Sequence, residues 1–365
     1  MQIRILPFPR AVFALLAAAA LCVPVAPIDA QAVADHVTIY GSLRMINGLN
    51  SAGDYEIDDK FSRIGLRGEL PMAEGFTAFA RAEMGLNMIK SPGQLVFSGD
   101  PGYAYGEDQD AVTTRLGFLG VRTPFGAFSW GKQWSPYYDL GGRTDEFNIY
   151  GGEAAGVYNL SDGDPSGTGR ASSAFQYRVS YRALSIGAQV QNRNTGGNDQ
   201  NFADTYGGSV VLSPAEGMTL GVGFSQVRDG VEDPDPDSRE VPDGDQAAVA
   251  GVSVERGRWT VHYTLSWFQE HEKDDEERFF GGWGTELFAR FNATQSWRLL
   301  GGFNYLTPED EHPGQYRIAY GMVGVQYTFV NDSRVFFEMK LEGSRDSEGD
   351  GNRQSIYGFG IRFNF

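Results

Sequence analysis

The chain has 365 residues, a formal net charge of −17, 48 glycines and 13% aromatic residues, with a mean hydropathy of −0.33. Beyond residue 35 no apolar run is long enough for a membrane-spanning helix, which excludes a helical membrane protein. The only cysteine is Cys22, which excludes a disulfide framework, a thiol nucleophile and a cysteine-ligated metal site from the rest of the chain.

The N-terminal segment has the features of a secretory signal peptide. Arg4 and Arg10 form a basic region, and the apolar stretch 11–23 is short and rich in alanine. Two small-x-small cleavage motifs follow. We expect cleavage just before Asp35, with the motif that ends at Ala32 as the alternative. Residues 1–34 are therefore predicted to be removed, and residues 35–365 to form a single domain.

Segments of alternating hydrophobicity recur through residues 35–365 with the spacing of β-hairpins. This pattern predicts about sixteen antiparallel strands, an even number, as bacterial outer-membrane barrels have. The predicted strands are 36–49, 61–71, 76–88, 113–123, 127–134, 171–181, 184–194, 205–213, 218–229, 245–256, 258–270, 282–292, 296–306, 317–329, 334–345 and 353–365. We therefore predict an all-β, transmembrane, antiparallel barrel.

Short and long connections alternate along this series of strands. The short ones are 72–75, 124–126, 214–217, 256–258 and 331–333, and the long ones are 50–60, 89–112, 135–170, 230–244, 271–281 and 346–352. Such alternation is typical of a barrel with short turns on one side and long external loops on the other. The third and longest of these loops, 135–170, is the connection most expected to be functional.

Arginines recur at positions that the alternation assigns to the inside of the barrel. They are Arg44, Arg63, Arg67, Arg115, Arg170 and Arg178. An arginine on the lipid face at mid-membrane would cost roughly 2–4 kcal/mol, which supports an inward orientation. Around Arg115 the pattern places Leu116 and Phe118 on the lipid face. The arginines are expected to form a cationic wall that attracts anions; alternatively, each pairs only with a lumen carboxylate such as Glu69 or Glu83.

Acidic residues are concentrated in two of the long loops, at 229–245 and 270–277, the second of which includes His271. The simplest interpretation is a solvated surface, and the alternative is bridging by divalent ions to anionic lipopolysaccharide. The run 233–237 lacks the glycine and terminal glutamate of an EF-hand loop, so we predict no metal site there.

The C-terminal strand separates two kinds of side chain. Tyr357, Phe359, Ile361, Phe363 and Phe365 fall on one face, and Ile356, Gly358, Gly360, Arg362 and Asn364 fall on the other. An aromatic and aliphatic face opposite a small or polar face suits a strand between lipid and water.

Several segments, taken in order, resemble the general porins of Gram-negative bacteria. Val37-Thr-Ile-Tyr-Gly-Ser-Leu-Arg44 is similar to the family's first strand, and Phe61-Ser-Arg-Ile-Gly-Leu-Arg-Gly-Glu69 to its second. The family's fourth strand is similar to Thr114-Arg-Leu-Gly-Phe-Leu-Gly-Val121. Its fifth strand, running into the constriction loop, is similar to Phe128-Ser-Trp-Gly-Lys-Gln-Trp-Ser-Pro-Tyr-Tyr-Asp139, and its sixth to Gly169-Arg170 followed by Tyr177-Arg178. Phe365 matches the family's C-terminal assembly signal.

The resemblance implies a homotrimer of sixteen-stranded barrels in the cell outer membrane. It also implies that the third external loop folds into the pore, where its carboxylates face wall arginines. By position, Arg63, Arg115 and Arg170 match those arginines, while Ser42 replaces a lysine of some members and Arg44 partly compensates. The candidate loop carboxylates are Asp139, Asp145, Glu146 and Glu153, with Asp162 and Asp164 as further lining residues.

The implied function is passive diffusion of ions and small hydrophilic solutes through a transverse field. The alternative is a substrate-selective channel of the same fold, for a sugar, phosphate or organic acid. A sugar channel would need a row of aromatic rings that stack against the sugar, and Trp134, Tyr137 and Tyr138 are candidates for such a row. The acidic outer loops favour cations and the arginine wall favours anions, and we expect a cation preference. Expected partners are outer-membrane lipid and lipopolysaccharide. No catalytic residue, cofactor, metal or nucleic-acid partner is predicted.

Two other classes of protein are compatible with this composition. A barrel enzyme needs a nucleophile–base pair or a carboxylate–histidine dyad near the barrel rim, and the chain offers only His36, His262, His271 and His312. His262 is predicted to be an ordinary wall residue. The other class is a secreted soluble β-protein, which would stay in solution without detergent.

Overall fold

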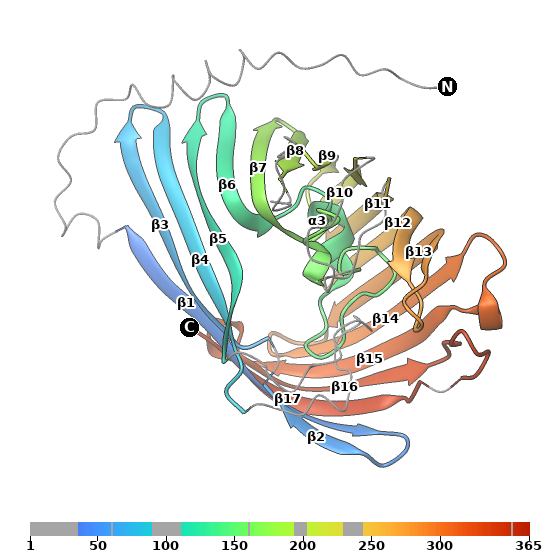
Figure 1. The fold of residues 1–365 in the computed structure, drawn as a ribbon. Helices are drawn as coiled ribbons and strands as arrows, with labels where there is room; N and C mark the ends of the chain where they lie inside the picture. The colour runs from blue at the N-terminus through green and yellow to red at the C-terminus, as the bar shows by residue number, and fades with distance from the viewer. Residues whose placement is uncertain are drawn as a thin grey trace.

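A computed structural model describes residues 36–59, 61–89, 111–159, 161–192, 203–228, 244–351 and 353–365. The predicted signal peptide and most of the acidic run 229–245 lie outside these residues. Within them, the chain forms one antiparallel sheet in which strands that are neighbours in sequence pair with each other, except that β2 and β3 both pair with β1. The strand β1 (Val37–Asn50) also pairs with β17 (Ile356–Asn364), which closes the sheet into a barrel (Figure 1).

The other strands follow in chain order around the barrel. They are β2 (Tyr55–Asp58), β3 (Arg63–Ala73), β4 (Phe76–Leu86), β5 (Val112–Thr123), β6 (Gly126–Trp134), β7 (Arg170–Tyr181), β8 (Leu184–Gln191), β9 (Thr205–Ala215), β10 (Met218–Val227), β11 (Gln246–Arg256), β12 (Trp259–Lys273), β13 (Phe279–Asn292), β14 (Trp297–Pro308), β15 (Ile318–Thr328) and β16 (Arg334–Glu342).

The segments β2 and β3 are two parts of one strand. Both pair with β1: Asp58 lies opposite Ile46, and Arg63 lies opposite Ser42. The break between them contains Phe61, whose φ of 70° does not fit a regular strand. The described strands therefore make a sixteen-stranded barrel, and the fold predicted from the alternation is confirmed.

The connections at one end of the barrel are uniformly short. They are 74–75, 124–125, 182–183, 216–217, 257–258, 293–296 and 329–333, and both β1 and β17 have their chain-terminal ends on this side. We call this side the short-turn end. The last of these connections holds the 3-10 helix η4 (Val330–Asp332), and the opposite end holds η3 (Pro313–Gln315).

The two faces of the sheet differ as the alternation predicts. Large apolar side chains such as Ile39, Phe359 and Ile361 are exposed on the outside, whereas Ile46 and Ser42 of β1 are buried on the inside. In an outer-membrane barrel the exposed apolar band faces lipid.

The prediction for Leu116 and Phe118 is wrong, because a β-bulge interrupts β5 at Arg115. Glu83 of β4 lies opposite Leu116, but the next residue of β4 lies opposite the residue two positions earlier on β5. The extra residue reverses the alternation, so Leu116 points inward and is 1% exposed, while Leu119 points outward and is 62% exposed. Phe118 then shares the inner face with Leu116.

The C-terminal residue completes the closure of the barrel. The backbone N–H of Gly41 donates to the carbonyl of Phe365 at 2.9 Å, and the N–H of Phe365 donates to the carbonyl of Gly41 at 3.2 Å. A Cβ atom on Gly41 would lie 2.3 Å from the ring of Phe365. Glycine at this position is therefore required for the ring to lie across β1.

The connection between β6 and β7 enters the barrel. Its described part, residues 135–159 and 161–169, is called the inner loop below. It contains α3 (Tyr138–Gly141), η1 (Gly142–Thr144) and η2 (Ser161–Gly163), and α3 contacts β10 and β11. Figure 1 shows α3 and the loop that follows it inside the ring of strands. No helix among the described residues is long and apolar enough to cross a membrane.

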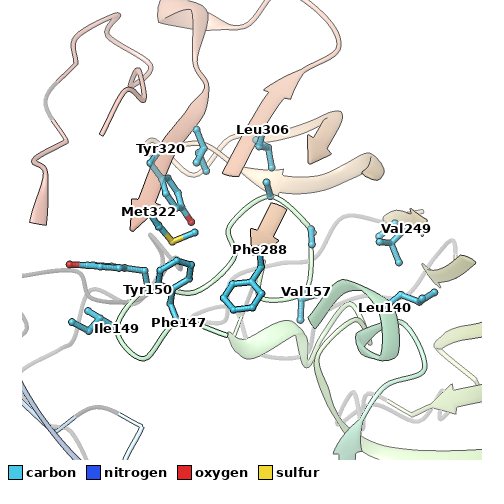
Figure 2. Close-up of a cluster of buried hydrophobic side chains, with 14 of the residues drawn as sticks. Leu140, Phe147, Ile149, Tyr150, Val157, Val249, Phe288, Leu306, Tyr320 and Met322 are labelled. Atoms are coloured by element: carbon cyan, nitrogen blue, oxygen red, sulfur yellow. The ribbon is translucent and has the colours of Figure 1, made fainter. Parts of the chain in front are cut away.

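The main hydrophobic core lies between the inner loop and the inner face of the wall (Figure 2). The ring of Phe147 meets Phe288 of β13 edge to face, with centroids 5.6 Å apart. Leu140 of α3 lies over Gly221 and Gly251, where a Cβ atom would come within 3.1–3.2 Å of its side chain. The small wall residues thus make room for the loop.

Candidate functional site

Two wall glutamates hold the backbone of the inner loop. Glu338 of β16 accepts hydrogen bonds from the N–H groups of Asn148 at 3.0 Å and Ile149 at 2.9 Å. Glu286 of β13 accepts from the N–H groups of Ala154 and Ala155 at 2.7 and 2.8 Å. Both glutamates are fully buried. Four backbone donors that the loop carries into the barrel are therefore satisfied by the wall.

Tyrosine hydroxyls add further connections to the same loop. Tyr320 of β15 donates to the carbonyl of Gly151, and Tyr150 of the loop donates to the carbonyl of Ile356 on β17, both at 2.9 Å. Within the loop, Tyr137 donates to the carbonyl of Ala155 at 2.8 Å. The loop is thus attached to β13, β15, β16 and β17, across the lumen from its own root at β6 and β7.

Asp145 and Glu146 stand at the point where η1 ends. Asp145 accepts a hydrogen bond from the hydroxyl of Tyr158 at 2.7 Å, and Glu146 lies 3.7 Å from a guanidinium nitrogen of Arg290. Burial raises the pKa of Asp145, although Arg44 and Arg63 act in the opposite direction. Loss of bulk water also raises the pKa of Glu146 above its usual range.

The predicted wall arginines Arg63, Arg115 and Arg170 all project into the barrel, but their partners differ. Arg115 forms an ion pair with Glu83 at 3.0 Å. Arg170 pairs with Asp162 and lies over the ring of Trp134, 5.4 Å from its centroid. Among the described residues, Arg63 makes no ion pair.

Arg44 and Arg67 of the predicted set also face the lumen. Arg44 of β1 donates to the carbonyl of Asn148 at 3.1 Å, which places it beneath the inner loop. Arg67 of β3 lies directly opposite Arg81 of β4 and is exposed to the lumen. Sequence alone assigned both residues the same role, whereas only Arg44 contacts the loop.

Two of the candidate carboxylates are neutralised locally. Asp139 of α3 forms an ion pair with Arg178 of β7, so these two predicted site residues are partners of each other. Glu153 pairs with Arg353 at 3.1 Å and with Lys340 at 3.7 Å. By contrast, Asp145 acts on Arg44, Arg63 and Arg115 without a close ion pair, and Glu146 has only the longer contact with Arg290.

Sequence reasoning gave no site role to several further lumen arginines, or to the two glutamates that hold the loop. Among these arginines, Arg290, Arg298 and Arg334 occupy inward positions of β13, β14 and β16, and Arg362 of β17 lies on the inner face to which the alternation had already assigned it. The two-residue period that identified Arg63 as an inward residue also places Glu286 and Glu338 inside the barrel.

The histidines take structural positions. His271 was predicted in an acidic loop, but it is the third residue from the end of β12 and is 0% exposed, because β12 continues to Lys273. His262 is a wall residue, as predicted, and stacks on Phe288 with centroids 5.8 Å apart.

The aromatic residues at the root of the inner loop pack on one another. The rings of Trp134 and Tyr138 are stacked with centroids 3.8 Å apart, and Tyr158 meets Tyr138 edge to face. With Arg170 over Trp134, this arrangement resembles a packed cluster more than an open row of rings for a sugar.

Comparisons with known proteins agree on one family. A family model described as Gram-negative porin matches residues 11–365. Outer membrane protein F of Serratia marcescens is 24% identical over 293 residues, which cover 78% of this chain and 70% of that protein. Outer membrane porin F of Xenorhabdus nematophila is 22% identical over 340 residues, or 84% of this chain and 86% of that protein.

Solved structures share the fold at low sequence identity. OmpF of Salmonella typhi, in complex with daunomycin, has a TM-score of 0.71 and 17% identity, covering 90% of this chain and 97% of its own. An anion-selective porin from Comamonas acidovorans has a TM-score of 0.65 and 16% identity, with coverages of 90% and 99%. At these identities the likeness concerns the barrel itself.

Proposed function

Because the chain belongs to the Gram-negative porin family and resides in the outer membrane, we propose that it is a passive diffusion channel for ions and small hydrophilic solutes. The observation that supports the proposal is the attachment of the inner loop to the far wall, which begins just after Asp145 and Glu146. A loop held there would narrow the lumen beside the guanidinium groups of Arg44, Arg63 and Arg115.

The opposed charges produce a field across the pore. Carboxylates on the loop side attract cations, and guanidinium groups on the wall side attract anions. Within low-dielectric walls both effects are stronger than in bulk water. A zwitterionic solute aligns its dipole with the field, and an apolar solute has to displace ordered water. No step requires a covalent intermediate, so the activity is transport without chemistry.

The test is the conductance of the purified protein in a planar bilayer under a salt gradient. Steady channels that close in three equal steps support a trimer of open barrels. Folded protein that forms no channel contradicts the proposal. The same bilayer measurement separates a general channel from a substrate-selective one. Saturable block of the conductance by one neutral sugar would favour the substrate-selective alternative.

A matched pair of variants tests the field. Asp145→Asn removes a loop charge that faces the arginines, whereas Asp164→Asn removes one that pairs with Lys132 at 3.0 Å near the root of the loop. We expect the first variant to shift the reversal potential towards anion preference by more than the second. Equal shifts would show that the loop charges act only through their sum.

A further inference from the structure

Three arginines from three neighbouring strands face one another in register inside the barrel. Arg44 of β1 lies directly opposite Arg362 of β17, and Arg362 lies directly opposite Arg334 of β16. We call these three residues the arginine row. Like charges directly opposite each other in a sheet are destabilising. The barrel therefore holds three guanidinium groups together against their mutual repulsion.

Few carboxylates neutralise the row. Among the described residues, neither Arg44 nor Arg362 forms an ion pair, and the Nε of Arg362 donates only to the neutral Ser42 and Asn364, at 3.0 and 2.9 Å. Arg334 pairs with Asp332, but that carboxylate is shared with Arg298, 2.8 Å away. The row thus keeps an excess of positive charge.

Arg44 has hydrogen-bonding capacity that the protein does not use. Its side chain is 9% exposed, and its Nε is buried without a hydrogen-bond partner in the described part of the protein. One terminal nitrogen donates to the carbonyl of Asn148. A buried guanidinium donor without an acceptor is costly. The other terminal nitrogen of Arg44 makes no hydrogen bond with the described residues and is not fully buried, so it is the donor to which an acceptor in the lumen would bind.

The nearest loop carboxylates do not balance the cluster. Glu146 and Asp145 stand above the row, and Arg63, opposite Ser42, adds a fourth guanidinium beside it. Asp332 and Glu338 both act on Arg334, and Glu83, which pairs with Arg81 and Arg115, also acts on Arg63. These five carboxylates face eight guanidinium groups, namely the row, Arg63, Arg81, Arg115, Arg290 and Arg298, so local neutralisation alone does not explain the row.

The row lies at the short-turn end of the lumen. Arg334 is two residues beyond η4, and Arg362 is three residues from the C-terminus. Because Arg44 contacts the inner loop three residues after Asp145, we expect a solute that passes these carboxylates to meet the row. This position differs from that of Arg115 and Arg170, which face the root of the inner loop.

We propose that the arginine row is a binding site for a doubly charged oxyanion of the sulfate or phosphate type. This inference rests on the proposed function, since it requires a lumen open to solutes. Guanidinium groups present paired N–H donors that match the oxygens of such an anion, whereas chloride offers no fixed set of acceptors. One dianion spanning Arg44 and Arg362 would also relieve the repulsion between them.

The experiment measures the conductance of the wild-type protein in a planar bilayer in potassium chloride while inorganic sulfate is added to the bathing solution. We expect sulfate to reduce the chloride conductance in a saturable way. In Arg362→Gln the half-blocking concentration should rise about tenfold, the loss expected for one charge-assisted hydrogen bond. Arg122→Gln is the matched control, because Arg122 lies at the same end of the barrel but pairs with Glu69 outside the row.

A second variant separates the geometry of the row from its charge. Arg44→Lys keeps the positive charge but loses the planar fork, and we expect it to weaken the sulfate block while leaving the reversal potential in chloride nearly unchanged. Folding of each variant is checked by its heat-modifiable mobility on gels.

Two results would overturn the proposal. One is a linear, non-saturable effect of sulfate on the conductance, and the other is an equal rise of the half-blocking concentration in Arg362→Gln and Arg122→Gln. If the wild type forms no channel, the proposed function fails first.

Discussion

His271 of β12 and Asp245, one residue before β11, form a fully buried pair in which Nδ1 and Oδ1 are 2.6 Å apart. The other ring nitrogen of His271 lies 2.8 Å from the carbonyl oxygen of Gly156 in the inner loop. Both of these partners are hydrogen-bond acceptors, an arrangement that suits a ring with a proton on each nitrogen. One histidine thereby attaches the second half of the inner loop to the wall.

Replacing this histidine is predicted to loosen the loop. His271→Phe keeps the ring that stacks on Phe268 but leaves Asp245 and the Gly156 carbonyl without this donor. We expect increased open-channel noise and a lower unfolding temperature, since a buried group that loses its partner costs about 1–3 kcal/mol. His312→Phe, which removes a contact with Asp274 outside the inner loop, is the control. Equal noise in both variants would contradict the attachment.

The glutamate at the centre of β16 is predicted to set the position of the loop. Glu338→Ala removes the acceptor for the N–H groups of Asn148 and Ile149, and we expect a loss of about 1–3 kcal/mol for each buried donor left unsatisfied. The single-channel conductance should change as well, because the loop is released beside Asp145. Glu338→Gln keeps one acceptor oxygen and should lie between Ala and the wild type. Wild-type conductance in Glu338→Ala would argue against this role.

Selectivity is predicted to depend on pH above the range of ordinary carboxylates. The pKa values of Asp145 and Glu146 are raised, so both groups take up protons at a higher pH than the usual 3.9 and 4.3 or so. As the pH falls through the raised pKa values, the loop loses negative charge while the arginines stay charged. The reversal potential should therefore move towards anion preference.

The control for this pH dependence is the double variant Asp145→Asn, Glu146→Gln. It should already have the reversal potential that the wild type reaches at low pH, and it should change little between pH 8 and pH 5. A double variant that titrates as the wild type does would place the responsible carboxylates elsewhere.

The contact between Gly41 and Phe365 is predicted to be required for assembly. Gly41→Ala places a Cβ atom 2.3 Å from the ring of Phe365, so the last residue is displaced from β1. We expect slower refolding into the heat-modifiable form. Gly301→Ala is the matched control, because a Cβ atom there meets nothing within 4 Å. Refolding of Gly41→Ala at the rate of Gly301→Ala would show that the ring moves aside freely.

The strands could be predicted from sequence because lipid outside and water inside impose a two-residue period on every strand. That signal fails where the backbone departs from the period, as at the bulge beside Leu116. It also failed at His271, where the charge of the following residues suggested a loop although β12 continues beyond it. Both errors arise from the local backbone conformation, a bulge in one case and a longer strand in the other, which the order of apolar and polar residues does not reveal.

The site was predictable only in part. Alternation identifies Arg63 and Arg115 as inward residues, since the wall fixes their direction. It cannot show that Asp139 pairs with Arg178, or that Glu338 holds Asn148, because those partners are chosen by the path of the inner loop. That path is set by contacts between residues as much as 206 positions apart in sequence.

The position of the hydrophobic core inside the barrel has a consequence for the order of folding. Phe147 and Leu140 precede most of the wall against which they pack, since their partners on β10 to β17 lie later in the chain. Neither residue has its native neighbours until the C-terminal half has been made, and β1 pairs with β17 last in sequence order. Contacts of such long sequence separation form slowly. The barrel is therefore expected to close and to acquire its interior in one late step, in which the inner loop is enclosed as the ends of the chain meet.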